Sequence, residues 1–150
     1  MELTFEQGPI RPPSEAKSLL IRATRNCPWN KCAFCRTYQG KKFELRSREE
    51  IKDDIRNARM IADEIRALSW KLGGGGRVTD AVVRRVYSGG NGYNDAFRSV
   101  CAWFYWGGES VFLQDANSLI LKTDELVEIL SFVKEQFPGV NRITSYCRSK

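Results

Sequence analysis

Three cysteines near the N-terminus are the residues of this sequence that most clearly indicate chemistry. Cys27, Cys32 and Cys35 follow the pattern C-x4-C-x2-C within nine residues. Thiolates are the usual protein ligands of iron–sulfur clusters and frequent ligands of zinc. Three thiols on one flexible loop can bind three irons of a 4Fe–4S cluster and leave the fourth iron open. In a reducing compartment, such a group indicates metal binding rather than disulfides.

A closed zinc site needs a fourth protein ligand, and this sequence offers few. It contains no histidine, which removes the commonest partner of cysteine at zinc. The same absence excludes hydrolases of the Ser–His–Asp and Cys–His types. The two remaining cysteines are Cys101 and Cys147. Cys101 stands among apolar residues and is predicted to be a buried thiol, whereas Cys147 stays a candidate fourth ligand.

The bulk composition bounds the class of protein. The 150 residues suit one domain or part of a larger one, and the net charge of +6 comes from 24 basic and 18 acidic residues. This excess of positive charge suits an anionic small molecule or a nucleic acid and does not decide between them. No apolar leader follows Met1 and no run of about 18 apolar residues could span a membrane. We therefore expect a cytoplasmic protein without a membrane segment.

The apolar pattern predicts the elements that must position the cysteines. Residues 1–17 contain four Gly and Pro residues and predict an irregular segment. Ser47 and Glu50 have the spacing of a capping box, which predicts a helix that ends by Gly73. Further along the chain we expect a strand over 18–24, a polar loop over 25–45, a helix over 79–87 capped by Thr79, an aromatic helix over 94–106, a strand over 110–114, a helix over 123–136 capped by Thr123, and a strand over 142–146.

This order of strands and helices predicts an α/β fold of parallel βα units with right-handed crossovers. In such folds the loops at the carboxyl ends of the strands form the functional face. The cysteine loop follows the first strand, Asp115 follows the second, and residues 146–150 follow the third. We expect all three to lie at the same edge of the sheet.

The segment Cys27-Pro-Trp-Asn-Lys-Cys32-Ala-Phe-Cys35 resembles the cluster motif of the radical S-adenosylmethionine superfamily. Its first interval is one residue longer than the commoner C-x3-C-x2-C spacing. Phe34 stands where the family typically has an aromatic residue. The order of elements around the motif is also similar, so the resemblance covers roughly residues 18–150.

The resemblance implies an N-terminal portion of a partial TIM-type barrel that binds a 4Fe–4S cluster through Cys27, Cys32 and Cys35. S-adenosylmethionine would bind the open iron, and an electron donor would reduce the cluster. Reductive cleavage would then give a 5′-deoxyadenosyl radical that acts on an unknown substrate. Phe34, Gln114 and Asp115 are the implied cofactor-binding residues, the last two as acceptors for the amino group of S-adenosylmethionine. No catalytic residue is assigned.

Two glycine motifs are predicted to have structural roles. Gly107-Gly-Glu109 spells a family motif, but it precedes the second strand and is interpreted as a helix stop and strand entry. Gly73–Gly76 lacks the Gly-Lys-Ser/Thr ending of a phosphate loop and is interpreted as a connector. The aromatic stretch from Phe97 to Trp106 is predicted to pack in the core rather than to stack on bases.

About three strands are expected, roughly half of a complete barrel of this family. Residues 18–150 are therefore interpreted as a truncated core domain, completed by the remaining barrel portion or by a partner subunit. An open third strand would otherwise expose an unpaired edge. Two alternatives stay open: an inactive cluster-carrying fragment, and a zinc-binding or nucleic-acid-binding module that uses the same cysteines.

Overall fold

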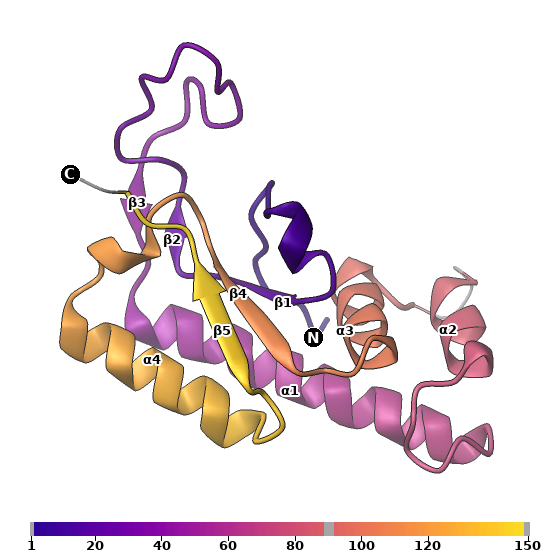
Figure 1. Ribbon diagram of the computed structural model, residues 1–150. Helices are drawn as coiled ribbons and strands as arrows, with labels where there is room; N and C mark the ends of the chain where they lie inside the picture. Colours follow the sequence, from indigo (N-terminus) through magenta and orange to yellow (C-terminus); the bar gives the residue numbers. More distant parts are fainter. Residues whose placement is uncertain (1, 89–91, 149–150) are drawn as a thin grey trace.

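Three parallel strands form the central sheet of the protein, whose computed structural model describes residues 2–88 and 92–148. The strands β1 (Leu19–Arg22), β4 (Ser110–Gln114) and β5 (Arg142–Ser145) lie in the order β1-β4-β5. Two helices, α1 (Arg48–Lys71) and α4 (Thr123–Gln136), cover one face of this sheet (Figure 1). The expected α/β fold with a parallel sheet is thus confirmed.

The helix α1 begins where the sequence predicts. The Ser47 hydroxyl accepts from the backbone N–H of Glu50 at 3.2 Å, and the Glu50 carboxylate accepts from the backbone N–H of Ser47 at 2.8 Å. This reciprocal capping box satisfies two donors that the first turn leaves free. The predicted cap at Thr123 is wrong, because the extended residue before α4 is Lys122 and Thr123 is already helical.

Two shorter helices, α2 (Asp80–Tyr87) and α3 (Asp95–Tyr105), follow α1 and precede β4. Thr79 occupies the N-cap position of α2 without a capping hydrogen bond, whereas the Asn94 side chain accepts from the backbone N–H of Phe97 to cap α3. Gly73–Gly76 connects α1 to α2, and Gly107-Gly-Glu109 lies between α3 and β4, as predicted.

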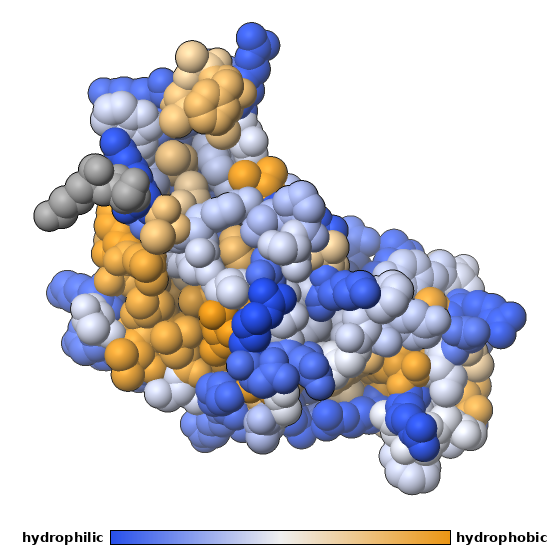
Figure 2. Space-filling model, in the orientation of Figure 1, coloured by the Kyte–Doolittle hydropathy of each residue, from blue (hydrophilic) through white to orange (hydrophobic). Residues whose placement is uncertain are grey.

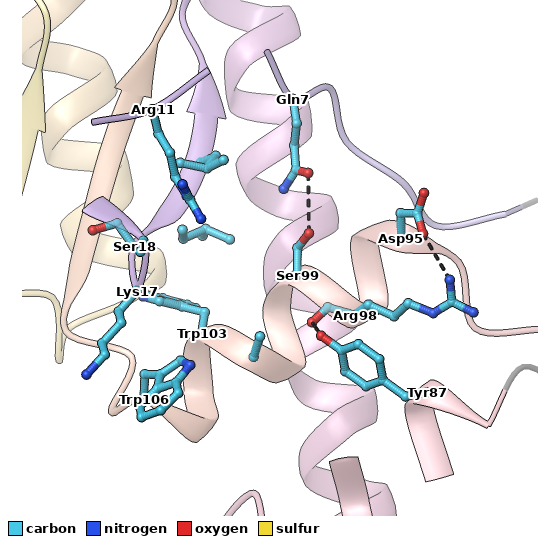
Figure 3. A pocket seen from close by; sticks show the side chains of 14 residues that line it. Gln7, Arg11, Lys17, Ser18, Tyr87, Asp95, Arg98, Ser99, Trp103 and Trp106 are labelled. Carbon is cyan, nitrogen blue, oxygen red and sulfur yellow. Dashed lines mark hydrogen bonds and ion pairs between the residues drawn. The ribbon is translucent and has the colours of Figure 1, made fainter. Parts of the chain in front are cut away.

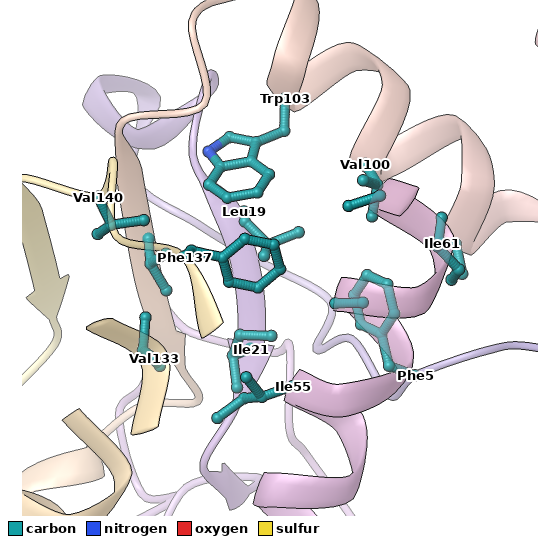
Figure 4. Close-up of a cluster of buried hydrophobic side chains, with 14 of the residues drawn as sticks. Phe5, Leu19, Ile21, Ile55, Ile61, Val100, Trp103, Val133, Phe137 and Val140 are labelled. Carbon is teal, nitrogen blue, oxygen red and sulfur yellow. The ribbon is translucent and has the colours of Figure 1, made fainter. Parts of the chain in front are cut away.

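The apolar core lies between the sheet and the helices (Figure 4). Trp103 is its largest fully buried side chain, and its indole N–H donates to the carbonyl of Ser110 at 2.8 Å. The predicted burial of the aromatic stretch is correct for Phe97 and Trp103 and wrong for Tyr105 and Trp106, which are exposed at the C-terminal end of α3. Other core residues in Figure 4 are Phe5, Leu19, Ile21, Ile55, Ile61, Val100, Val133, Phe137 and Val140.

The N-terminal segment, residues 2–17, first runs beside α1, where the Asn57 amide donates to the carbonyl of Thr4, and residues 8–11 then lie on the other face of the sheet, next to Leu20. It contains a short 3-10 helix, η1 (Pro13–Glu15). The fully buried amide of Gln114 accepts from the backbone N–H of Gly8 at 2.7 Å and donates to the carbonyl of Ile10 at 2.6 Å. The segment expected to be irregular therefore has a defined position against the carboxyl end of β4.

Apolar side chains gather on the surface beside β5 and over α4 and the short 3-10 helix η2 (Ser118–Ile120) (Figure 2). Leu119, Ile120 and Val127 belong to this apolar band and are about half exposed. The band runs along the side of the molecule where β5 forms the edge of the sheet. No helix among the described residues is long and apolar enough to cross a membrane.

Candidate functional site

The cysteine loop, residues 26–43, extends beyond the carboxyl edge of the sheet (Figure 1). A two-stranded antiparallel ladder closes its base, in which β2 (Thr24–Arg25) pairs with β3 (Glu44–Leu45). The sequence predicted one strand over 18–24 and a plain loop after it, so this ladder was missed. The register of β1 with β4 ends at Arg22, although Thr24 still accepts from the backbone N–H of Asp115 at 3.1 Å, and Thr24 and Arg25 also pair with the returning leg of the loop.

Two asparagines connect the outgoing leg of the loop to its returning leg. Asn26 and Asn30 have φ angles of 69° and 48°, a left-handed region that asparagine tolerates better than most residues. The Asn26 amide donates to the carbonyl of Lys42 at 2.6 Å, and the Asn30 amide donates to the carbonyl of Tyr38 at 2.7 Å. These contacts fix the course of the loop without an apolar core.

All three cysteines of the loop are free thiols. Cys32 is exposed, and Cys27 and Cys35 are half-buried. Cys35 donates its backbone N–H to the carbonyl of Cys32 at 3.3 Å, so these two cysteines stand at the ends of one tight turn. The Cys27 sulfur accepts from the backbone N–H of Asn30 at 3.4 Å.

The donor set has the right chemistry for a metal cluster, but the thiols are not gathered around one point. Among residues 2–88 and 92–148, no three His, Cys, Asp or Glu side chains are arranged so that they could hold a metal ion. Three accessible thiols within nine residues nevertheless provide soft sulfur ligands. Binding at this site would therefore require the loop to bring its thiols together.

The cysteine loop is rich in positive charge. It contains Lys31, Arg36, Lys41 and Lys42, and its sequence includes no Asp or Glu. Cations attract anionic ligands. The charge of the loop therefore favours binding of an anion near the thiols.

The chain that follows β5 also reaches the cysteine loop. The guanidinium of Arg148 lies 4.1 Å from the centre of the Trp29 ring, close enough for a cation–π contact. Cys147 is exposed beside it. Asp115, which follows β4, also contacts Asn26 of the cysteine loop. The segments after β1, β4 and β5 therefore lie at one edge of the sheet, as predicted.

Asp115 is the buried carboxylate at this edge. Its Oδ2 accepts from the Arg22 guanidinium at 2.6 Å and from the backbone N–H of Asn26 at 2.6 Å. Only 1% of Asp115 is exposed, and a Cβ on Gly8 would collide with its Oδ1. Asp115 therefore connects β4, β1 and the start of the cysteine loop from beneath the N-terminal segment.

Tyr38 brings the returning leg of the loop to the same carboxylate. Its ring is buried, and burial raises the pKa of the Tyr38 hydroxyl well above its usual value, with a further rise from the negative charge of Asp115. Within the described residues, neither the Tyr38 hydroxyl nor Asp115 Oδ1 has a hydrogen-bond partner. Two buried polar atoms thus remain unsatisfied under the cysteine loop.

The three predicted cofactor-binding residues have different environments. Phe34 is 90% exposed on the cysteine loop, free to contact a ligand. Gln114 and Asp115 are buried and bound to the N-terminal segment and to Arg22. A ligand could reach these two polar side chains only if residues near Gly8 moved aside.

An arginine cluster beneath the loop was not predicted from the sequence. Glu6 of the N-terminal segment lies 2.9 Å from Arg25, 3.0 Å from Arg46 and 3.8 Å from Arg22. Arg46 also pairs with Asp54 at 2.7 Å, where burial raises the pKa of the Asp54 carboxyl despite that partner. One feature of the sequence could have indicated this cluster: Arg22 and Arg25 lie within and just after an otherwise apolar strand.

Comparison with protein-family models, with curated proteins and with solved structures found no match for this chain.

Proposed function

We propose that this chain binds a 4Fe–4S cluster through Cys27, Cys32 and Cys35 and presents its fourth iron to S-adenosylmethionine, as the N-terminal portion of a radical S-adenosylmethionine enzyme. The observation that carries the proposal is the position of three free, accessible thiols on a loop at the carboxyl end of a parallel sheet. A reduced cluster of this type supplies the electron that cleaves S-adenosylmethionine to methionine and a 5′-deoxyadenosyl radical.

The protein's own residues would position the cluster and its ligands. The cations Lys31, Arg36, Lys41 and Lys42 would stabilise the negative charge of three thiolates and of the carboxylate of S-adenosylmethionine. Phe34, exposed beside Cys35, would contact the cofactor. Asp115 would keep the start of the loop in place through Asn26.

The edge of β5 supports a second part of the proposal, that further βα units or a partner subunit complete a barrel. Among the described residues, no strand pairs with the outer edge of β5. The apolar band of Leu119, Ile120 and Val127 lies beside that edge (Figure 2). An unpaired edge next to exposed apolar side chains is suited to cover by another strand.

Anaerobic reconstitution with iron and sulfide tests the cluster. We expect a brown protein with about four irons and four sulfides per chain. Each of Cys27→Ser, Cys32→Ser and Cys35→Ser should lower both contents severalfold. Cys101→Ser is the matched control, because this thiol is buried on α3 and should not affect the cluster. Stoichiometric zinc uptake without iron uptake would contradict the proposal and favour a zinc module.

A second measurement separates an active domain from an inactive cluster carrier. After reduction with dithionite, the reconstituted chain should release 5′-deoxyadenosine from S-adenosylmethionine, and the Cys32→Ser variant should not. S-adenosylmethionine should also change the electron paramagnetic resonance spectrum of the reduced cluster, because it binds the open iron. A cluster whose spectrum is unchanged by S-adenosylmethionine would indicate an inactive carrier.

A further inference from the structure

A groove at the opposite end of β1 from the cysteine loop has its own binding chemistry (Figure 3). It has a volume of about 440 Å³ and lies between α3, the start of β1 and the N-terminal segment. Small-molecule sites commonly measure about 300–1,000 Å³. Gln7 and Arg11 enter from the N-terminal segment, Lys17 precedes β1, and Arg98 and Ser99 come from α3.

Two cations of the groove have no acidic partner. Within the part of the chain that the structure describes, neither Arg11 nor Lys17 forms an ion pair with a carboxylate, although many of the other arginines do. Lys17 instead places its ammonium 4.2 Å from the centre of the Trp106 ring. Both side chains are exposed, so a bound anion could reach them without any change in the fold.

The other polar groups of the groove are mostly donors. Asp95 is the one carboxylate among the lining residues, and it is 93% exposed and already paired with Arg98 at 3.1 Å. The Ser99 hydroxyl donates to Gln7 Oε1 at 3.3 Å, which turns the amide nitrogen of Gln7 away from α3. That nitrogen is buried and has no acceptor among the described residues. The lining of the groove therefore offers a ligand more hydrogen-bond donors than acceptors.

The rest of the wall is apolar. It is lined by Leu19 and Leu20 of β1, by Ala102 and Trp103 of α3, and by Trp106, which directly follows α3. Two free cations beside an apolar wall with an indole ring fit a ligand that carries a negative head group on an apolar or aromatic body. A plain inorganic anion would leave this wall unused.

We propose that the groove binds a small organic anion, a phosphate or carboxylate attached to an aromatic or apolar body no larger than a mononucleotide. Arg11 and Lys17 bind the head group through charge-assisted hydrogen bonds, and the wall formed by Leu20, Ala102 and Trp106 contacts the body. The groove is independent of the three loop cysteines, so this site does not depend on the proposed cluster.

Titration of the protein with phenyl phosphate, benzoate, inorganic phosphate and phenol at constant ionic strength tests the site. Amide and indole NMR shifts provide the readout. We expect phenyl phosphate, benzoate or both to give saturable shifts confined to Leu20, Ser99 and Trp106, with weaker effects of inorganic phosphate and phenol. Whichever of the first two binds tighter identifies the head group. Equal affinity for inorganic phosphate and phenyl phosphate would contradict the role of the apolar wall.

Two variants locate the binding. The double variant Arg11→Gln/Lys17→Gln should raise the Kd about tenfold or more, since two charged donors are lost. Ala102→Phe should fill the groove and abolish binding while all charges stay in place. The control Lys71→Gln/Lys122→Gln removes the same charge from exposed positions elsewhere and should leave the Kd within about twofold. Absence of saturable binding, or equal weakening by the control, would overturn the proposal.

Discussion

The helix α3 and the cysteine loop present the same side chain in opposite environments. Cys101 of α3 is fully buried, and burial raises the pKa of its thiol to about 11. Cys32 is exposed, and Cys27 and Cys35 are half-buried, on a loop whose sequence contains three lysines and an arginine. Apolar packing makes the first thiol inert, whereas the loop keeps its three thiols accessible. Accessibility, more than the number of cysteines, separates the candidate metal ligands from a structural residue.

The two regions also differ in what maintains their shape. α3 is fixed by buried side chains such as Val100 and Trp103. The cysteine loop is fixed by hydrogen bonds from Asn26 and Asn30 and by the contacts of Asp115 at its base. We therefore expect changes in α3 to affect global stability and most changes in the loop to affect only local structure.

Thiol alkylation should show the largest difference between the regions. At pH 8 a thiol with a pKa of about 11 is only about one-thousandth ionised. Iodoacetamide should therefore modify Cys32 about a hundredfold faster than Cys101, or more, because burial adds to the ionisation effect. Peptide mass spectrometry over time measures both rates. Comparable native rates would contradict the burial of α3.

Truncation of a tryptophan in each region compares their contributions to stability. Trp103→Ala should lower the free energy of unfolding by about 3–5 kcal/mol, since it removes a buried indole that packs edge-on against Phe137. Trp29→Ala should cost less than about 0.5 kcal/mol, because Trp29 is 43% exposed. Urea unfolding monitored by circular dichroism measures both variants. Equal losses would show that the loop has a packed core of its own.

Asp115 is the exception that connects the loop to the folded domain. Asp115→Ala leaves Arg22, whose side chain is 14% exposed, without its hydrogen-bonded carboxylate and with only the more distant Glu6 at 3.8 Å, and it should cost about 3 kcal/mol. Asp115→Asn keeps an acceptor and should cost about 1–2 kcal/mol. Asp53→Ala is the matched control, since Asp53 is 68% exposed and should cost at most about 0.5 kcal/mol. Thermal unfolding of the three variants gives the order of their stabilities. If Asp115→Ala lost no more stability than Asp53→Ala, the proposed role of Asp115 in fixing the loop would be wrong.

The local features of the fold were the ones that could be predicted from the sequence. The capping box of Ser47 and Glu50 depends only on residues three apart, and it is present. The burial of Cys101 follows from its apolar neighbours on one helix. The shared edge of the cysteine loop and Asp115 follows from the direction of parallel strands, and the contact with Asn26 confirms it.

The contacts between distant segments could not be predicted. Gly8 and Ile10 bury Gln114 from more than 100 residues away, and no periodicity in residues 2–17 indicates which face they cover. The environment of Gln114 and Asp115 therefore differs from that of acceptors accessible to S-adenosylmethionine, which the resemblance implied. The same is true of the Arg22–Asp115 pair, whose two residues are 93 positions apart.

Glu15, at the amino end of the sheet, is the position with the smallest expected effect. It tests whether polar contacts at that end stabilise the fold, as those of Asp115 do under the cysteine loop. Burial alone raises the pKa of Glu15, but hydrogen bonds from Ser18 and Arg142 and the positive charge of Arg142 outweigh it and lower the net pKa below 4.5. A depressed pKa means that the unfolded chain binds more protons near this pH. The contribution of Glu15 is therefore complete above pH 4.5 and is lost as the pH falls through the pKa of the folded state.

Unfolding curves between pH 3 and pH 7 should show this dependence as a difference between the protein and the variant Glu15→Gln. We expect the two stabilities to differ by a constant amount near neutral pH and to converge as the pH falls below 4.5. Glu109→Gln, at an exposed position near the same end of the sheet, is the control and should follow the unmodified protein. If Glu15→Gln instead stayed parallel to the protein throughout, the carboxylate of Glu15 would contribute by packing rather than by charge.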